Sequence, residues 1–250
     1  MTDLKYSDRA YAFQVRVVSP LHIWSGRSLV ENIDYVYANG AYWIIDLDRL
    51  LDLLDPGQDA HLLSRLDTGE ALSRVLNIND LTDISARDPR AVYRVAGPEQ
   101  PSNRQITDRL VREHIKDMRG RAYIPGSTIK GMIRTILAYQ AWEQRGLRLN
   151  VDSLGKGARF AAEETEAAMF VPARVRRGNR PNFDIMRAIR VRDSQSTDAK
   201  LRVTQVRVLS ESSPRGDIYL GTLQPNTVFT LQVWLNDFLR RDERVRQEMG

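Results

Sequence analysis

Cysteine is absent from this chain of 250 residues. Without thiols the protein can form neither a disulfide nor a cysteine-based zinc site. Histidine is also scarce, because only His22, His61 and His114 are present. A metal site built from several histidines is therefore not expected, and nothing in the sequence indicates another cofactor.

Long apolar runs are missing as well. No stretch approaches the roughly 18 apolar residues that a membrane-spanning helix needs. The first residues, Met1–Tyr6, are polar and lack the apolar core of a signal peptide. These absences predict a cytoplasmic protein with no membrane partner.

The composition is that of a globular protein with a basic surface. Hydrophobic residues make up 42% of the chain and charged residues 28%, which suits a core and a charged exterior. The length allows one large domain, or one domain with a sizeable insertion. A formal net charge of +5 favours a polyanionic partner, although an arginine-rich surface facing water would give the same value.

The most informative segment is 124–134, which reads Ile-Pro-Gly-Ser-Thr-Ile-Lys-Gly-Met-Ile-Arg. Pro125 and Gly126 end whatever precedes them, and Ser127 or Thr128 can then cap a new helix. We expect this helix to continue to about Arg145. Its predicted apolar face consists of Ile129, Met132, Ile133, Ile136 and Leu137.

A polar stripe lies on the other side of the first turns of this predicted helix. It consists of Ser127, Lys130, Gly131 and Arg134, which are three or four residues apart and therefore stack on one side. Free backbone N–H groups, a hydroxyl, two cations and a glycine that allows close approach together suit a phosphate group. From spacing alone, an ordinary capped helix whose cations face water fits equally well.

Two other functions of this segment are disfavoured. It is not a P-loop, because neither glycine is followed by Lys-Ser or Lys-Thr. Ser127 and Lys130 also match the Ser-x-x-Lys of penicillin-recognising acyl enzymes, but the companion tripeptides Ser-Asp-Asn and Lys-Thr-Gly do not occur here.

Three segments in a fixed order resemble a known family. They are Val17–Gly26, Pro125–Arg134 and Ala188–Ser194. Together they are similar to the signature segments of the RAMP proteins, the RNA-binding subunits of CRISPR interference complexes. The resemblance extends from Tyr11 to Trp234 and is greatest to the subunit that caps type III-A (Csm) complexes at the 3′ end of the guide RNA. Trp24 stands where the family usually has glycine.

The resemblance implies an α+β fold with a ferredoxin-like, RRM-type RAMP core. It implies a single RAMP domain over residues 1–250, with helical and loop insertions near 52–104 and 150–182. The C-terminal part of the family fold is expected to be absent or short.

The resemblance also implies a function. The chain would be a non-catalytic RNA-binding subunit that supports guide RNA maturation and antiviral defence in a ribonucleoprotein. The implied partners are the guide (CRISPR) RNA, target RNA, the adjacent backbone RAMP subunit and the other subunits of the effector complex. A RAMP subunit of a related type III complex is the alternative.

The candidate RNA-binding residues fall in the first two segments and in an arginine-rich loop, whose guanidinium groups can pair with phosphate oxygens. They are His22, Ser25, Gly26, Gly126, Ser127, Thr128, Lys130, Gly131, Arg134, Arg176, Arg177 and Arg180. Asp193 and Ser194 are expected to have a structural role beside them. From the residues alone, a structural histidine at a strand end and a solvated loop are the alternatives for His22 and for the arginines.

Asp34 is the residue on which the alternative function, cleavage of target RNA, depends. Backbone RAMP subunits of type III complexes have an aspartate after the His-Ile segment that promotes metal-dependent cleavage of target RNA. Here Asp34 lies inside a predicted hairpin strand and too close to His22 for that pattern. A lone carboxylate would bind Mg²⁺ only with help from substrate phosphates. Asp34 is therefore a weak catalytic candidate.

The remaining periodicity places strands at both ends of the chain and helices between them. Strands are predicted around 13–17, 33–37, 42–45, 187–192, 201–209, 217–224 and 227–235, with Asn39-Gly40 as a type I′ turn. Helices are predicted at 47–54, 61–66, 70–76 and 106–118. Residues 77–104 and 150–182 are interpreted as loops or insertions.

Overall fold

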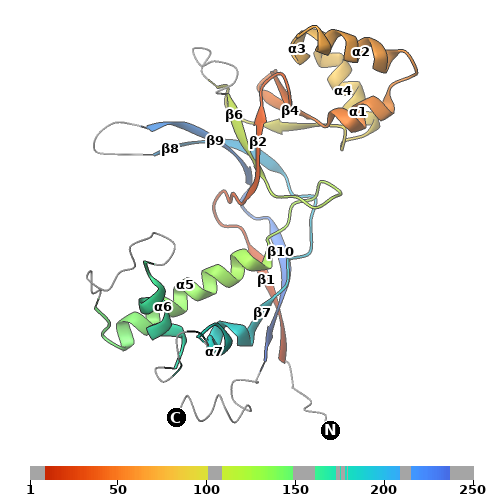
Figure 1. Cartoon of the computed structure of the whole chain (residues 1–250). Coiled ribbons are helices and arrows are strands. Elements are labelled where there is room, and N and C mark those ends of the chain that lie inside the picture. The colour runs from red at the N-terminus through yellow and green to blue at the C-terminus, as the bar shows by residue number, and fades with distance from the viewer. Residues whose placement is uncertain are drawn as a thin grey trace. The chain divides into compact units, whose positions relative to one another are not determined.

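The computed structural model describes residues 9–100, 109–148, 161–172, 175, 178, 180–208 and 215–236. The chain divides into two compact units. Unit 1 comprises Met1–Val15, Ile124–Gln195 and Phe229–Gly250, and unit 2 comprises Arg16–Tyr123 and Ser196–Val228. The predicted α+β class is confirmed, since both units combine a sheet with helices (Figure 1).

Unit 2 is built on a curled seven-stranded sheet in the order β2-β6-β9-β8-β5-β4-β3. Neighbours are antiparallel except for the parallel pairs β5–β8 and β6–β9. The inside of the sheet is filled by a cluster that includes Leu29, Tyr35, Tyr42, Val111 and Tyr219. The strands are β2 (Trp24–Val30), β3 (Tyr35–Ala38), β4 (Ala41–Ile45), β5 (Val92–Ala96), β6 (Leu110–His114), β8 (Leu201–Val208) and β9 (Arg215–Leu223).

The β3–β4 hairpin turns as predicted at Asn39-Gly40, where both residues have positive φ. β4 is buried along its whole length because it contributes to two cores. Tyr42 and Ile44 face the sheet interior, and Trp43 and Ile45 pack against helices. Alternate side chains of a strand point to opposite faces, so one strand joins both clusters.

Four helices cover this hairpin (Figure 1). They are α1 (Leu47–Leu53), α2 (Gln58–Asp67), α3 (Leu72–Val75) and α4 (Ile78–Arg87). The first three confirm the predicted helices between residues 47 and 76. Leu50, Leu62, Leu72 and Leu81 are almost fully buried where the helices meet the sheet.

Two predictions for this region are wrong. The loop predicted over 77–104 is wrong in its described part, because residues 77–100 contain α4 and β5. The start of α4 is a capping box between Asn77 and Asp80. The helix predicted over 106–118 is strand β6 in its described part, held between β2 and β9. Strand pairing on both sides outweighs a local pattern that also fits a helix.

Unit 1 contains a three-stranded sheet in the order β1-β10-β7. Its strands are β1 (Arg9–Arg16), β10 (Val228–Leu235) and β7 (Ile189–Val191), all at predicted positions. Its helices are α5 (Gly126–Gln144), α6 (Glu163–Phe170), α7 (Arg180–Phe183) and the 3₁₀-helix η4 (Ile185–Ala188). α6 corrects the loop predicted over 150–182 in the part that the structure describes.

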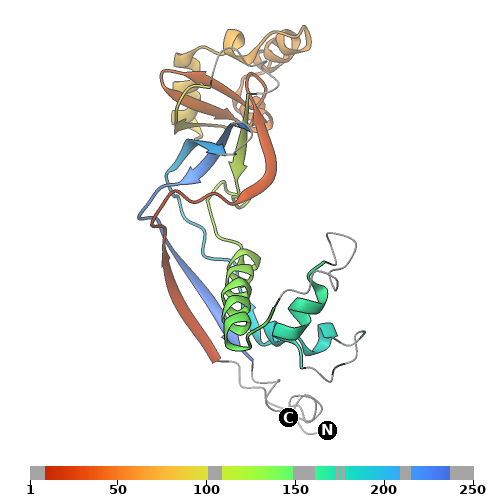
Figure 2. The same ribbon diagram turned by 90° about the vertical axis from the view of Figure 1, so that its left-hand side faces the viewer.

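Helix α5 packs beside β7 and α6 (Figures 1 and 2). Ile133, Leu137 and Trp142 of α5 contact the buried Met169 and Phe170 of α6. The predicted apolar face is only partly correct, because Met132 and Ile136 are 53% and 51% exposed. None of the described helices is long and apolar enough to cross a membrane.

Candidate nucleic-acid interface

The start of α5 is fixed by a close backbone contact in unit 1. Gly126 is the first residue of the helix, and Pro125 occupies the N-cap position. A Cβ on Gly126 would lie 2.8 Å from the Arg192 carbonyl carbon and still closer to the Val191 carbonyl oxygen. Only glycine therefore allows the helix to begin this near to β7.

Two side chains after β7 complete this anchor. The Gly126 N–H donates to Oδ1 of Asp193 at 2.7 Å, and the Ile124 N–H donates to the buried Oγ of Ser194 at 2.9 Å. The Ser194 N–H returns a hydrogen bond to the Ile124 carbonyl at 2.9 Å. Asp193 and Ser194 thus hold the N-terminal end of α5 in place, and the Asp193 carboxylate sits at the positive end of the helix dipole.

The predicted helix cap is wrong in detail. Neither Ser127 nor Thr128 caps α5, since both lie within its first turn, and the side-chain acceptor comes instead from Asp193. The Thr128 N–H donates to the Pro125 carbonyl. Ser127 and Thr128 are consequently exposed, and no described residue accepts the Ser127 N–H.

The polar stripe of α5 divides into exposed and engaged residues. Gly131 is exposed and Lys130 is half-buried, with no carboxylate paired to Lys130 in the described part of the chain. A Cβ on Gly131 would meet nothing within 4 Å. Packing within the described chain therefore gives no reason for a glycine at this mid-helix position.

Arg134 is engaged within unit 1. Its guanidinium donates to Asp184 at 2.9 Å and to Glu166 at 2.8 Å. It also lies 4.0 Å from the centre of the Phe170 ring. Two carboxylates already neutralise this charge, so Arg134 joins α5 to α6 and to the segment before η4.

The arginine-rich loop is only partly described. Arg176 and Arg177 lie outside the described residues. Arg180 begins α7, where its guanidinium pairs with Glu164 of α6 at 2.9 Å.

In unit 2 His22 contacts a second histidine. Nδ1 of His22 is 2.7 Å from the Gly221 carbonyl, and its ring lies edge-on to His114, with 6.1 Å between ring centres. Nδ1 of His114 accepts the Ile23 N–H at 3.2 Å. Burial, with His22 and Lys116 nearby, lowers the pKa of His114 to about 4.

Ser25 and Gly26 belong to an irregular part of the edge strand β2. The pairing with β6 shifts register between Trp24 and Ser28, and Gly26 has φ of +92°. The Ser25 hydroxyl accepts the Arg27 N–H at 3.1 Å. Such a bulge pushes these exposed residues out of the regular sheet.

Asp34 lies in the turn before β3 rather than inside a hairpin strand. Its carboxylate accepts the Val30 N–H at 2.9 Å and pairs with Arg27. Both contacts hold the β2–β3 turn. Among the described residues no group of three or more histidine, aspartate or glutamate side chains is placed to hold a metal ion.

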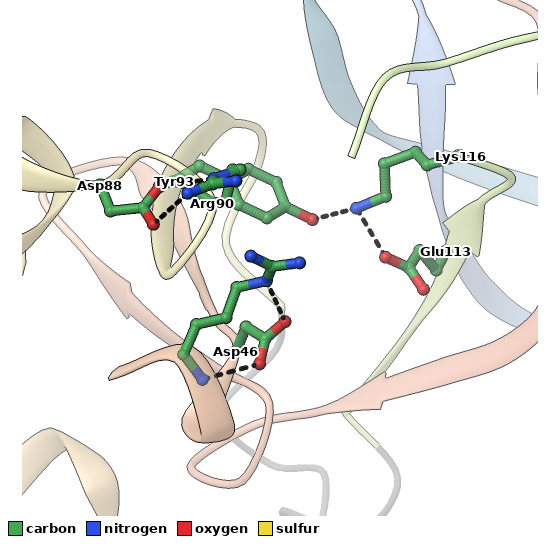
Figure 3. Close-up of polar contacts among 7 residues, drawn as sticks. Asp46, Asp88, Arg90, Tyr93, Glu113 and Lys116 are labelled. Atoms are coloured by element: carbon green, nitrogen blue, oxygen red, sulfur yellow. Dashed lines mark hydrogen bonds and ion pairs between the residues drawn. The ribbon is translucent and has the colours of Figure 1, made fainter. Parts of the chain in front are cut away.

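A polar cluster spans the curled sheet of unit 2 (Figure 3). Nζ of Lys116 contacts the Tyr93 hydroxyl of β5 and lies 2.7 Å from the Glu113 carboxylate of β6. Burial lowers the pKa of Lys116, but Tyr93 and Glu113 outweigh it and raise that pKa above its ordinary value. Burial raises the pKa of Tyr93. The cluster links the non-adjacent strands β5 and β6, because Lys116 contacts both the Tyr93 hydroxyl and the Glu113 carboxylate.

The predicted RNA-binding residues therefore form two sets. One set gathers at the start of α5 in unit 1, beside the structural residues Asp193 and Ser194, and Arg180 of α7 lies in the same unit. Its members are Gly126, Ser127, Thr128, Lys130, Gly131 and Arg134. His22, Ser25 and Gly26 lie around β2 in unit 2. Sequence reasoning missed the partners of Arg134, the buried His114, and Arg112 beside Trp24. No local signal identifies them, because each depends on residues distant in sequence.

A family model for the RAMP superfamily matches residues 14–241. The chain belongs to the RAMP superfamily. The match spans both units, and therefore both sets of predicted RNA-binding residues.

Three known proteins are similar to this chain. The curated protein of Streptococcus thermophilus named CRISPR system Cms protein Csm5 is 24% identical over 209 residues, covering 79% of this chain and 55% of the relative. The crystal structure of T. onnurineus Csm5 has a TM-score of 0.60 and 21% identity, over 95% of this chain and 74% of that one. A chain in a cryo-EM structure of a Csm–crRNA–target RNA ternary complex of a type III-A CRISPR-Cas system has a TM-score of 0.60 and 24% identity, over 91% of this chain and 64% of that one.

These likenesses establish the fold shared with the two solved structures. The chain spans about half the length, 55%, of the curated relative that it matches.

Proposed function

We propose that this protein is a non-catalytic RNA-binding subunit of a type III-A CRISPR effector ribonucleoprotein in the cytoplasm. It caps the complex at the 3′ end of the guide RNA and supports guide maturation and antiviral defence. Its partners are the guide RNA, target RNA, the adjacent backbone RAMP subunit and the other subunits. The relative in the Csm–crRNA–target RNA complex supports this assignment, as does membership of the RAMP superfamily.

The observation that carries the proposal is the exposed first turn of α5. Asp193 and Ser194 hold this turn from behind, while Ser127, Thr128 and Lys130 offer hydroxyls, an amide and a cation. Such groups bind phosphates without reading bases. In this proposal Lys130 is the main charge, and Arg134 keeps the helix in place.

Gly131 supports the same surface. A glycine inside a helix costs roughly 1 kcal/mol relative to alanine. No packing in the described chain requires it, since a Cβ there meets open space. Close approach of an RNA backbone beside Lys130 explains why a glycine stands at this position.

The test measures the salt dependence of RNA binding. Fluorescence anisotropy of a labelled single-stranded RNA is followed with the full chain over a series of salt concentrations. Lys130→Ala should weaken binding and reduce the slope of log K against log salt by about 0.7, the value for one lost phosphate contact on a single strand. Lys200→Ala, in unit 2, serves as the matched control. An unchanged slope for Lys130→Ala would contradict the proposed phosphate contact.

An RNA-cleaving subunit is the alternative, and the geometry of Asp34 weighs against it. Both carboxylate oxygens of Asp34 are already engaged, by Arg27 and by the Val30 amide, and a metal ion there would compete with the positive charge of Arg27. That alternative predicts Mg²⁺-dependent cleavage of target RNA that is lost in Asp34→Ala. The proposed function predicts no such loss, because Asp34 serves the β2–β3 turn.

A further inference from the structure

Trp24 is an exposed tryptophan on the edge strand of unit 2. It is 52% exposed, whereas Trp43 in the same unit is 6% exposed and belongs to the core. A ring that stays half exposed gains only part of the burial energy that a core ring such as Trp43 gains. Part of the ring is therefore open to a ligand.

The ring of Trp24 is held in a defined position. Its Nε1 donates to the Arg27 carbonyl at 3.0 Å, across the bulge that contains Gly26. Arg27 is itself fixed, because its N–H donates to Ser25 and its guanidinium pairs with Asp34. A ring fixed in advance loses little conformational entropy when a ligand stacks on it.

Positive charge lies directly at the ring. The guanidinium carbon of Arg112, on the adjacent strand β6, lies over the ring at 5.5 Å from its centre. No carboxylate in the described part of the chain pairs with Arg112, which is exposed. Arg112 therefore keeps its charge available to an anion beside the ring.

We propose that Trp24 is a stacking platform for one nucleobase of single-stranded RNA, with Arg112 attracting the neighbouring phosphate. Exposed aromatic rings interleaved with cations are the chemistry that binds single strands without sequence preference. This inference rests on the proposed RNA-binding function and adds a second contact, in the other unit. The charge at the ring favours RNA over an apolar protein partner.

The experiment compares variants of the full chain by anisotropy with a labelled single-stranded oligouridylate RNA. Trp24→Ala should bind about tenfold more weakly, within the range of stacking on one aromatic ring. Its salt slope should not change, because no charge is removed. Trp24→Phe should keep most of the affinity, since it retains an aromatic face.

Tyr139→Ala is the matched control. Tyr139 is another exposed aromatic residue, at 63%, but its hydroxyl donates to the Glu143 carboxylate, and no cation of the described chain covers it. Its removal should leave RNA affinity unchanged. Trp24→Leu provides a second non-aromatic variant in case Trp24→Ala does not fold.

The outcomes separate this inference from the proposed function. If Trp24→Ala and Trp24→Leu bind RNA like the wild type while Lys130→Ala still weakens binding, the stacking platform is wrong and the proposed function stands. If the wild-type chain binds no RNA, alone or with its partner subunits, both fail. If the Trp24 variants keep RNA affinity but lose a partner subunit, Trp24 is a protein contact and the inference is overturned.

Discussion

Replacing Arg134 with alanine separates a structural role from an RNA-binding role at the signature helix. The hydrogen bond to Asp184 is the more buried of its two ion pairs, with the Asp184 side chain 22% exposed, and should contribute about 1–2 kcal/mol. The pair with Glu166 is half exposed and should contribute about 0.5 kcal/mol. The contact with the Phe170 ring adds about 0.5–1 kcal/mol. Together, these losses mean that Arg134→Ala should lower the free energy of unfolding by roughly 2–3.5 kcal/mol.

The assay is urea unfolding of the full chain, followed by circular dichroism, because α5 and α6 are a large part of the helix in unit 1. Lys130→Ala is the matched control on the same helix and should unfold within about 0.5 kcal/mol of the wild type. Arg134→Lys should be intermediate, since it keeps the charge but cannot bond both carboxylates through one planar fork. If Arg134→Ala unfolds at the wild-type urea concentration yet loses RNA affinity, Arg134 faces RNA and its structural role is refuted.

Three further predictions concern the buried His114 and two glycines of α5. The pKa of His114 is about 4 in the folded protein and 6.5 in the unfolded chain. Between these pH values the unfolded chain binds a proton at His114 that the folded protein does not bind. The free energy of unfolding therefore falls as the pH drops from 6.5 towards 4. This loss of stability should reach about 3 kcal/mol. It should be absent in His114→Asn, which keeps an acceptor for the Ile23 N–H. If thermal unfolding shows the same acid sensitivity in both proteins, the prediction is contradicted. Gly131→Ala should raise the free energy of unfolding by about 0.5–1 kcal/mol while weakening RNA binding, and unchanged RNA affinity would contradict the proposed RNA contact at Gly131. Gly126→Ala should lower the free energy of unfolding, because its Cβ meets the backbone at the end of β7.

Sequence patterns predict an element correctly where neighbouring residues alone determine its structure. The Asn39-Gly40 turn needs two positive φ angles, which those residues supply without help from the rest of the chain. Pro125 and the change of periodicity mark the helix that starts near Gly126. The alternation along β10 follows from one buried face, with Phe229, Leu231 and Val233 inside.

Long-range contacts explain the error at β6. Leu110, Val111 and Ile115 fit helical spacing, and only pairing with β2 and β9 makes β6 a strand. The error at α4 has a different cause, because both of its signals are local: Asn77 and Asp80 form a capping box, and Ile78, Leu81 and Ile84 follow at helical spacing on one face. The loop interpretation of this segment overlooked them.

The sequence identifies which residues belong to the candidate site, but not what each of them does. Spacing groups Arg134 with Lys130, yet the two carboxylate partners of Arg134 lie 32 and 50 residues away in sequence. The Asp193 carboxylate at the start of α5 comes from 67 residues away. No local rule assigns such partners, so the charges left for RNA become clear only in three dimensions.

The most direct test of the central claim is the RNA that accompanies the protein. The chain is co-expressed with its neighbouring subunits, the complex is purified, and the length of the bound RNA is measured for the wild type and for Lys130→Ala. The proposed function predicts a discrete RNA of uniform length with the wild type, and RNA that is lost or left untrimmed with Lys130→Ala. A complex that assembles with the wild-type chain but carries no discrete RNA would contradict the account.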